Sequence, residues 1–494
     1  MRRFFVVVIL GIAMTAPALA ADDVVTKAMK LYEKRHYTEA ALSLTNDLAG
    51  IDKGRQGLAN LALGMIYLKN SMLHRELHQA ALGVSQDYLR KLAAAQGQAR
   101  SRFVFFYLGD LFLEAGKPSV SMPYLEKFIK TDGIEPRYRS LAGVCLGLCY
   151  FLAKEPDKAA AQWNGIDSSD PEVQAELAAA YSTAGLAAKN PVKAADEAFA
   201  AATRGGKQPS MRMVKNLLSV YSRAGMIDKG LILLRQRDLK AYSYREQLGK
   251  SKVITFYDPA LLGDAATLYG QASVYYLEKA AADTKAKEMA EFQLGQAYAL
   301  AGAVDKSLKI SAQFVASAQM PQSYKDRLRV WQGAGLYQKS NVSDAVGVWD
   351  ELARKQPEDP ELLAEILLTC NRLKIECVSI VQRAAAVVES GEGKRFASLN
   401  SSLGKYHLGR LDNAKAVSYL EAGRDKANKN KIEANDPLLL VSLADGYYRM
   451  KKYSEALEIY FEMSRQFPEV RQIQDAMQGV YAMEHKSAGD VKIN

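Results

Sequence analysis

Two histidines, His74 and His78, lie four residues apart in the stretch HRELH and could present two imidazoles on one face of a helix. A metal site built on such a pair needs a third protein ligand, and the neighbouring sequence offers no evident one. The stretch also lacks the H-E-x-x-H pattern of zinc proteases. We therefore expect no bound metal and no cofactor.

The stretch GEGKR, residues 391–395, is partly similar to a phosphate-binding loop. That loop requires a glycine where Val388 stands and a serine or threonine where Arg395 stands. The chain also has no haem-attachment motif, no G-x-S-x-G motif and no carboxylate pair that differs from ordinary helix-surface charge. Because no residues show catalytic spacing, we do not expect an enzyme.

The four cysteines form two close pairs. Cys145 and Cys149 are one helical turn apart, so their side chains diverge and suit small buried apolar roles better than a disulfide. Cys370 and Cys377 flank a predicted turn between two helices, where the two arms come close. In an oxidising compartment this second pair could form a disulfide, and two buried thiols are the alternative.

The first twenty residues, MRRFFVVVILGIAMTAPALA, combine two arginines, an apolar run from Phe4 to Met14 and an A-x-A cleavage site at residues 18–20. Together these features predict a signal peptide over residues 1–20 that is removed from the mature protein. The apolar run is too short to span a bilayer, which takes about 20 residues. No other apolar run approaches that length, so we expect a soluble, periplasmic chain without a transmembrane segment.

The formal net charge of the 494-residue chain is +10, and cleavage of the signal peptide removes two of the positive charges. On a chain of this length the remaining excess is modest. It permits contact with an anionic polymer or a membrane surface, but ordinary basic surface charge explains it more simply. We expect no nucleic-acid partner.

A repeated pattern organises the chain and is clearest in KKYSEALEIY, residues 451–460. Similar stretches recur, each with a small residue early in its second half. These small residues stand at positions 40, 121, 159, 230, 307, 345, 414 and 456, so neighbours are separated by 38 or 42 residues or by roughly double that spacing. A period of this size is typical of a solenoid.

Each repeat has apolar residues at the spacing of two short amphipathic helices. The predicted turn between the helices contains Gly116, Gly225, Gly302 or Gly409. A small residue on each helix lets the backbones approach closely, and Trp163 and Trp349 fill the space between hairpins. Asp-Pro pairs at positions 170, 258, 359 and 436 should start helices. Since one hairpin cannot bury its apolar face alone, the hairpins must stack.

This pattern resembles the tetratricopeptide repeat family. The matching positions are the small, aromatic and glycine residues of the repeats, with Pro357 and Pro468 at the family's closing proline. Nine units are recognisable between residues 26 and 468, and degenerate copies are expected at 177–185 and 362–381. The resemblance implies an all-α, right-handed superhelical solenoid of helix-turn-helix repeats. It implies little about function, because the family is a binding scaffold in many settings.

We predict two repeat arrays. Residues 21–239 form an N-terminal array, and residues 259–485 form a C-terminal array that ends in a capping helix. Residues 240–258 lack helical periodicity and are predicted to be an irregular linker that packs its aromatic residues, with binding of polyanions or sugars as the alternative. Residues 486–494 are predicted to be a disordered tail.

Exported proteins of the resembled family are often adaptors in outer-membrane assembly, pilus assembly or polysaccharide secretion. The resemblance therefore implies a periplasmic scaffold that binds one or more proteins in a cell-envelope assembly or secretion complex. Direct binding of an anionic glycan or exopolysaccharide along the concave surface is the alternative. A salt titration separates the two, because polyanion binding weakens steeply as ionic strength rises.

The family also implies where a partner binds, since the first helices of successive hairpins line its concave surface. The predicted partner contacts are Tyr406, His407, Asp445, Tyr448 and Arg449 in the C-terminal repeats and Arg212, Lys215 and Arg223 in a middle repeat. Aromatic residues beside arginine are typical of a binding hot spot. The alternative for Tyr406 and Tyr448 is packing against a neighbouring helix, and for the basic cluster it is a solvated surface.

Overall fold

The structure is a computed structural model that describes residues 23–94, 103–207, 209–235, 242–248, 252–258, 260–317, 320–356, 359–390, 396–424, 435–470 and 472–484. The predicted signal peptide, the C-terminal tail, Pro357 and the stretch 391–395 lie outside these residues. The chain forms two compact units. The first unit comprises Met1–Glu76 and Tyr269–Val470, and the second comprises Leu77–Leu268 and Arg471–Asn494.

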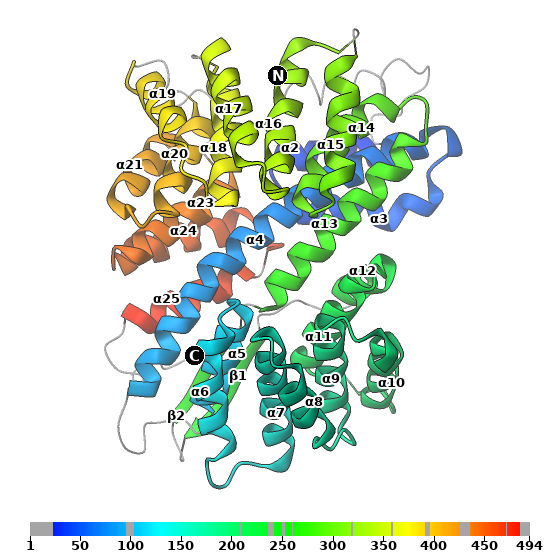
Figure 1. Ribbon diagram of the computed structural model, residues 1–494, viewed down its shortest axis with the longest axis vertical. Helices are drawn as coiled ribbons and strands as arrows, with labels where there is room; N and C mark the ends of the chain where they lie inside the picture. Colours follow the sequence, from blue (N-terminus) through cyan, green and yellow to red (C-terminus); the bar gives the residue numbers. More distant parts are fainter. Residues whose placement is uncertain are drawn as a thin grey trace. The chain divides into compact units, whose positions relative to one another are not determined.

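Helices that follow one another in the chain pack together as hairpins in the first unit (Figure 1). The hairpins are α2 (Val24–Glu33) with α3 (Tyr37–Asp47), α14 (Lys287–Leu300) with α15 (Val304–Ala316), α16 (Gln322–Gln338) with α17 (Val342–Lys355), α18 (Pro360–Leu373) with α19 (Val378–Glu389), α20 (Ala397–Leu408) with α21 (Asn413–Arg424), and α23 (Pro437–Arg449) with α24 (Tyr453–Gln466). Two short 3-10 helices, η1 (Leu48–Gly50) and η2 (Lys53–Arg55), precede α4 (Gln56–Ala94).

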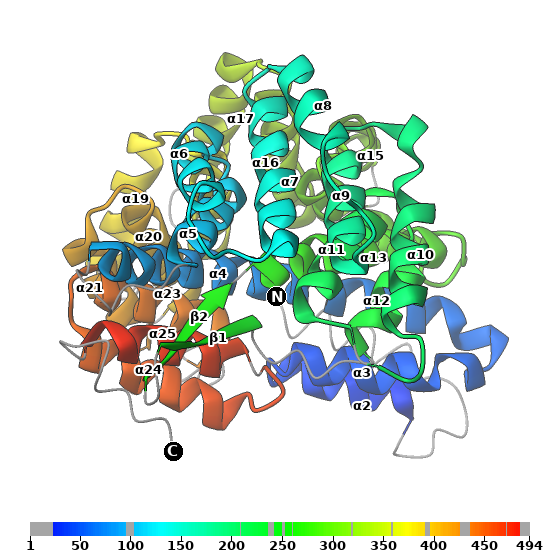
Figure 2. The same cartoon turned by 90° about the horizontal axis from the view of Figure 1, so that it is seen from below.

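The second unit is built from the same kind of hairpin (Figure 2). Its hairpins are α5 (Val104–Glu114) with α6 (Pro118–Ile129), α7 (Pro136–Leu152) with α8 (Pro156–Asn164), α9 (Pro171–Thr183) with α10 (Pro191–Ala202), and α11 (Met211–Arg223) with α12 (Ile227–Arg235). The 3-10 helix η4 (Ala187–Lys189) precedes α10. The two degenerate copies expected from the sequence are thus the complete hairpins α9–α10 and α18–α19. The fold class is the expected solenoid of helix-turn-helix repeats.

One prediction about secondary structure was wrong. Within the segment predicted as an irregular linker, β1 (Tyr242–Leu248) and β2 (Lys252–Asp258) form an antiparallel hairpin in which Leu248 lies opposite Lys252 (Figure 1). The β-branched and aromatic residues of KVITFYD favour extended backbone, and a search for helical periodicity alone overlooks that signal.

The turns inside the hairpins use the left-handed backbone conformation that glycine adopts easily. Gly116 and Gly225 each have a φ of 68°, and Gly302 has a φ of 75°, at the positions where the sequence predicts turns. In the α20–α21 turn, Gly409 keeps a helical conformation and Leu411 takes the positive φ, 64°. Glycine is therefore favoured at these turns but not required.

Aspartates cap three of the helices that begin with proline, α9, α18 and α23. Asp170, Asp359 and Asp436 each accept a hydrogen bond from a backbone N–H in the first turn of α9, α18 and α23. This satisfies a donor that has no partner within the helix. These three Asp-Pro pairs start helices as predicted, and the side chain at position 258 lies outside the described part of the structure.

Small residues bring the two helices of each hairpin together. Ser121 of α6 donates a hydrogen bond to the carbonyl of Gly109 on α5 at 2.6 Å, and Ser307 of α15 does the same to Gly295 on α14 at 2.8 Å. Bulky residues also repeat their geometry, since the indole N–H groups of Trp163 and Trp349 donate to main-chain carbonyls of α7 and α16 at 3.1 and 3.0 Å. The sequence repeat is therefore a repeat of contacts within hairpins.

Replacing Ala456 by tryptophan should disrupt the α23–α24 hairpin. Ala456 is fully buried, and overpacking costs about 1–3 kcal/mol. Because stability in a solenoid is largely a sum of neighbour terms, hydrogen exchange should accelerate first in α23 and α24. Glu458→Trp is the matched control, because Glu458 is exposed on the same helix. Equal exchange rates in the two variants would contradict the repeat register.

The longest described helix, α4, finds its partner far along the chain. Gly64 and Tyr67, which the sequence places in a loose repeat, pack against α13 (Ala260–Ala281). Ser273 donates to the carbonyl of Gly64 at 2.8 Å across 209 residues, and the ring of Tyr67 stacks on Tyr276 at 5.6 Å. No helix in the described part of the chain combines the length and the apolar composition needed to cross a membrane.

The α4–α13 pairing explains why the compact units do not follow the predicted array boundaries. The boundary at Leu77 falls within α4, and the boundary at Leu268 falls within α13. In sequence, the segment Leu77–Leu268 therefore separates the parts of α4 and α13 that pack together in the first unit. The predicted capping helix is α25 (Gln472–Glu484), which belongs to the second unit, where Gly479 lies against Val84 of α4. The first unit therefore contains hairpins from before and from after the segment Leu77–Leu268.

The first and last hairpins of the first unit meet. Arg35, in the turn between α2 and α3, lies 3.6 Å from the carboxylate of Asp436 at the start of α23. His36 lies 3.0 Å from Glu469, just after α24, and its ring is 5.3 Å from the ring of Phe467. The array of the first unit therefore curves until its two ends are in contact.

Candidate interaction surfaces

First helices of the first unit face a part of α4. Lys405 of α20 forms an ion pair with Glu76 of α4 at 3.1 Å, although 329 residues separate them. Burial and the charge of Glu76 raise the pKa of Asp445 on α23, while Arg449 acts in the opposite direction. The inner surface of these C-terminal hairpins therefore accommodates a helix of the same chain.

The two tyrosines predicted as partner contacts are buried, with 5% of Tyr406 and 6% of Tyr448 exposed. The hydroxyl of Tyr406 accepts a hydrogen bond from the backbone N–H of Cys377 at 3.3 Å, and its ring lies under the guanidinium of Arg410. The ring of Tyr448 lies 5.6 Å from that of Tyr453. Both tyrosines pack against neighbouring segments of the chain, which is the alternative considered for them.

The remaining C-terminal residues differ in accessibility. Arg449 pairs with Asp445 at 2.7 Å and donates to the carbonyl of Leu408 at 3.1 Å, and 32% of its side chain is exposed. His407 stacks on Tyr419 of α21, and its pKa is lowered by burial, which outweighs the effect of a neighbouring carboxylate. Of this set, Arg449 offers the largest exposed charged side chain to a partner.

A buried ionic network joins the first helices of the second unit. Arg212 of α11 is 1% exposed, and it donates to Glu176 of α9 at 2.6 Å and to Asp110 of α5 at 2.9 Å. Its guanidinium also lies over the ring of Phe106 and within 3.5 Å of the sulfur of Cys145 on α7. One arginine thus holds four consecutive hairpins together.

Asp110, Cys145 and Glu176 bring three possible ligand atoms within 4.8 Å of one another, as a metal site would. Burial opposes ionisation of Asp110, but the charges of Arg212 and Lys215 prevail and lower its pKa to about 2. Burial and the two carboxylates raise the pKa of the Cys145 thiol, and a protonated thiol is a poor metal ligand. The guanidinium of Arg212 supplies the positive charge that this cluster requires.

The basic cluster predicted in the middle repeat divides into two parts. Lys215 lies 3.4 Å from Asp110, and only 12% of its side chain is exposed, so it belongs to the network around Arg212. Arg223, at the end of α11, is exposed. Contact with a partner stays a prediction for this cluster. Arg223 is exposed, so it could make such a contact without any change in the packing of the unit.

Sequence reasoning missed the acidic members of these contacts. Asp110 is the one charged residue in YLGDLFL, and Glu176 is the one charged residue in QAELAAAY. A charge on an apolar helix face must be paired when it is buried. Single acids at such positions, together with Arg212 on a later first helix, were the available signal for an internal ion pair.

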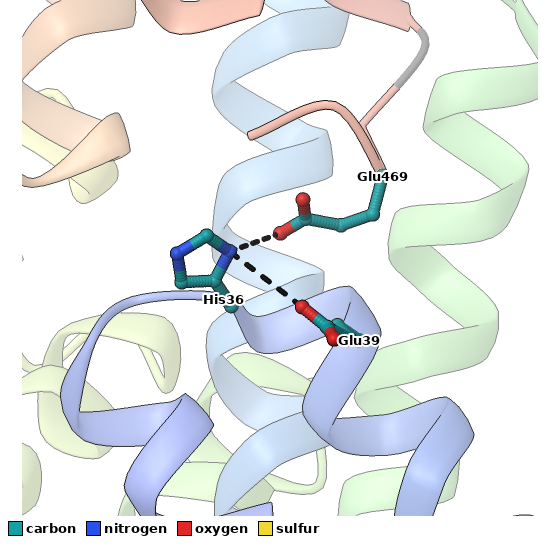
Figure 3. A group of neighbouring side chains, drawn as sticks. All are labelled: His36, Glu39 and Glu469. Atoms are coloured by element: carbon teal, nitrogen blue, oxygen red, sulfur yellow. Dashed lines mark hydrogen bonds and ion pairs between the residues drawn. The ribbon is translucent and has the colours of Figure 1, made fainter. Parts of the chain in front are cut away.

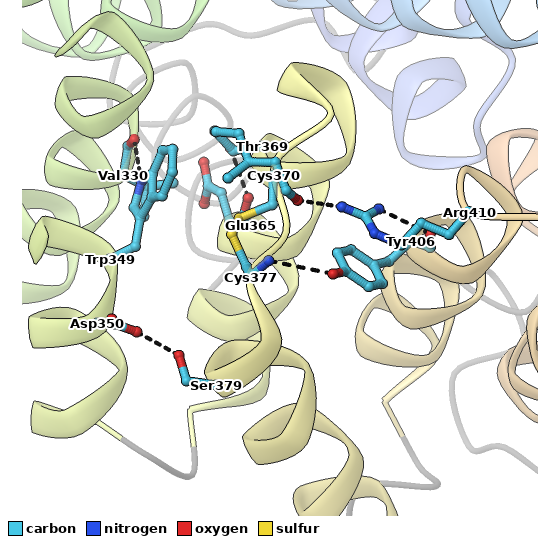
Figure 4. Close-up of a disulfide and its surroundings, with 11 residues drawn as sticks. Val330, Trp349, Asp350, Glu365, Thr369, Cys370, Cys377, Ser379, Tyr406 and Arg410 are labelled. Atoms are coloured by element: carbon cyan, nitrogen blue, oxygen red, sulfur yellow. Dashed lines mark hydrogen bonds between the residues drawn. A yellow bond between two sulfur atoms is a disulfide. The ribbon is translucent and has the colours of Figure 1, made fainter. Parts of the chain in front are cut away.

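The structure contains one disulfide among its described cysteines, between Cys370 at the end of α18 and Cys377 before α19 (Figure 4). Their Cα atoms are 6.5 Å apart. Besides the bond from Cys377 to the Tyr406 hydroxyl, Arg410 donates to the carbonyl of Ile375 in the same turn. Side chains of α20 and the turn after it thus hold the α18–α19 turn in addition to the covalent link.

Non-reducing digestion and mass spectrometry should recover the Cys370 and Cys377 peptides as a linked pair, with Cys145 and Cys149 as free thiols. The double variant Cys370→Ser/Cys377→Ser should lose about 2 kcal/mol of stability, because a small loop is no longer closed in the unfolded chain. Denaturation of oxidised wild type and of the double variant checks this. A crosslink to Cys145 would contradict the placement of the second-unit hairpins.

Stacked helix-turn-helix hairpins of this kind define an α-helical repeat fold of the tetratricopeptide type. The family model for the PPR repeat matches residues 440–466, within α23 and α24.

The solved structures that are similar to the chain include two helical-repeat examples. The crystal structure of yeast Tom70 has 11% sequence identity and a TM-score of 0.33, with 94% of this chain and 96% of that chain covered. The crystal structure of the APC/C hetero-tetramer Cut9-Hcn1 has 12% identity and a TM-score of 0.27, with 97% and 98% covered. Similarity at this level adds no evidence about function. No curated protein sequence matches the chain.

Proposed function

We propose that the protein is an exported scaffold that holds protein partners of a cell-envelope assembly or secretion complex in the periplasm. The observation that supports binding is the contact between Lys405 and Glu76, in which the inner surface of the first unit receives a helix. The same set of first helices leaves the charged side chain of Arg449 partly exposed, and it can receive a segment of another protein. The signal-peptide pattern of residues 1–20 supports export.

Photo-crosslinking in cells tests the scaffold proposal. A crosslinker placed at Arg449 or Arg223, on first helices, should yield a discrete adduct with one protein partner. The matched controls are Phe461 and Val342, which are 56% and 48% exposed and lie on second helices. They should yield no such adduct. Equal adducts at all four positions, or none at the first helices, would overturn the assignment of the binding surface.

Export has its own test. N-terminal sequencing of protein from the periplasmic fraction should begin at Ala21, because the charged residues, the apolar run and the A-x-A site occur together. A chain that keeps Met1 in that fraction would contradict cleavage. Accumulation in the cytoplasm would contradict the periplasmic assignment while leaving the scaffold proposal open to the crosslinking result.

Binding of an anionic glycan is the second candidate, and one observation favours it. Burial and the neighbouring charge of Arg75 lower the pKa of Arg372 to about 10, against the effect of Glu76. Two arginines that repel each other in a half-buried place would be stabilised by an added anion. Binding of a carboxylated polysaccharide should then weaken steeply with ionic strength, whereas salt-insensitive binding or none would count against this function.

A further inference from the structure

Three side chains with metal-binding chemistry come together where the first and last hairpins of the first unit meet (Figure 3). His36 lies directly before α3, and Glu39 lies in the first turn of that helix, so local backbone places them together. Glu469 reaches them from the segment after α24, more than four hundred residues later in the chain. The cluster therefore exists only because the array curves until its two ends touch.

The distances in this cluster fit a small divalent ion. The Nδ1 atom of His36 lies 3.0 Å from Oε1 of Glu469 and 3.8 Å from Oε2 of Glu39. Two ligands at zinc's usual bond lengths and tetrahedral angle are about 3.4 Å apart, so the observed separations lie on either side of that value. One ligand atom from each of the three residues lies within 4.8 Å of the others. Small side-chain movements would bring all three onto one ion.

The charges also favour a cation. Several other carboxylates of this unit with low exposure are paired with arginine, as Asp436 is with Arg35 at 3.6 Å and Glu365 is with Arg327 at 2.9 Å. Only 14% of the Glu469 side chain is exposed, and its ion-pair partner is the imidazole of His36. Within the described residues, neither Glu39 nor Glu469 has an arginine or lysine at ion-pair distance.

We infer that His36, Glu39 and Glu469 form a zinc site that fastens the first hairpin of the first unit to the last. One imidazole nitrogen and two carboxylate oxygens are a donor set that zinc accepts, with water in the fourth position. Zinc binds a ring nitrogen that carries no proton, so any proton between Nδ1 of His36 and Glu469 is released to solvent when the metal takes its place. The site is independent of the partner proposed above, because its ligands all belong to this chain.

Isothermal titration of the untagged, metal-free mature protein with zinc tests the inference. Wild type should bind one zinc ion, and magnesium should not compete, because magnesium prefers all-oxygen ligands. His36→Ala and Glu39→Ala should each raise the Kd for zinc at least about tenfold. His78→Ala is the matched control, since His78 lies 3.4 Å from Glu114, outside the cluster, and its loss should leave zinc binding unchanged.

Hydrogen exchange gives a second readout that separates loss of the site from loss of the fold. Zinc should slow amide exchange in α2 and α3 of wild type, because an ion bound only to the closed array stabilises it. Glu39→Ala is the informative variant, since the Glu39 side chain is 54% exposed and its loss should not unfold the hairpin. The inference is overturned if wild type binds no zinc, or if His36→Ala and Glu39→Ala bind zinc as wild type does.

Discussion

Replacing Arg212 by methionine should destabilise the second unit by about 3–5 kcal/mol, because the change leaves buried carboxylates without their cation. Arg212 is 1% exposed and bonds both Glu176 and Asp110. Native-state hydrogen exchange across α5 to α11 measures the loss within this unit. Exchange should rise in all four hairpins, since the network connects their first helices.

Two variants make this result interpretable. Lys229→Ala removes an exposed partner of Asp196 in the same unit and should cost at most about 1 kcal/mol. The triple variant Arg212→Met/Asp110→Asn/Glu176→Gln should recover part of the loss, because it no longer buries unpaired charge. If Arg212→Met cost no more than Lys229→Ala, the buried network would not hold the hairpins together.

Replacing Trp349 by alanine should cost the first unit about 3–5 kcal/mol. The side chain is 1% exposed, and its N–H donates to the carbonyl of Val330 at 3.0 Å. It also packs on Gly333, where an added methyl group would lie 2.5 Å from the indole nitrogen. The substitution leaves a cavity between α16 and α17 that no neighbouring side chain can fill without moving.

Hydrogen exchange in α16 and α17 measures the effect, with Phe461→Ala as the control. Phe461 is an aromatic residue of the same unit that is 56% exposed, so its truncation should change stability by less than about 0.5 kcal/mol. Similar protection of α16 and α17 from exchange in the two variants would show that this hairpin does not depend on the packing of Trp349 against Gly333.

The sequence by itself determined the hairpin, because its signals are local. Small residues such as Ser121 and Ser307, and turn glycines such as Gly116, act on neighbours within about twenty residues. Asp170, followed by proline, starts its helix through its own first turn. Signals of this range can be recognised in one repeat and counted along the chain, which is why even the degenerate hairpins could be predicted.

Only the tertiary structure decided which segments pair across the insertion. Nothing near Tyr67 indicates that its hairpin partner is α13, because an aromatic beside a small residue fits any first helix of the array. For the same reason, the sequence did not indicate that Arg212 binds carboxylates of its own chain. An arginine on an inner helix face looks alike in sequence whether it meets a partner or a buried carboxylate of its own chain.

The residues predicted to contact a partner show most clearly what the sequence determines and what the tertiary structure decides. The sequence placed Tyr406, Tyr448 and Arg449 on first helices, and they do lie there. Whether such a residue is exposed depends on what stacks against it, and stacking buries both tyrosines while leaving a third of the Arg449 side chain accessible. Periodicity is a property of neighbouring residues, whereas burial on an inner surface depends on the segments that stack there, which extend from the next hairpin to Glu76, 329 residues from its partner Lys405.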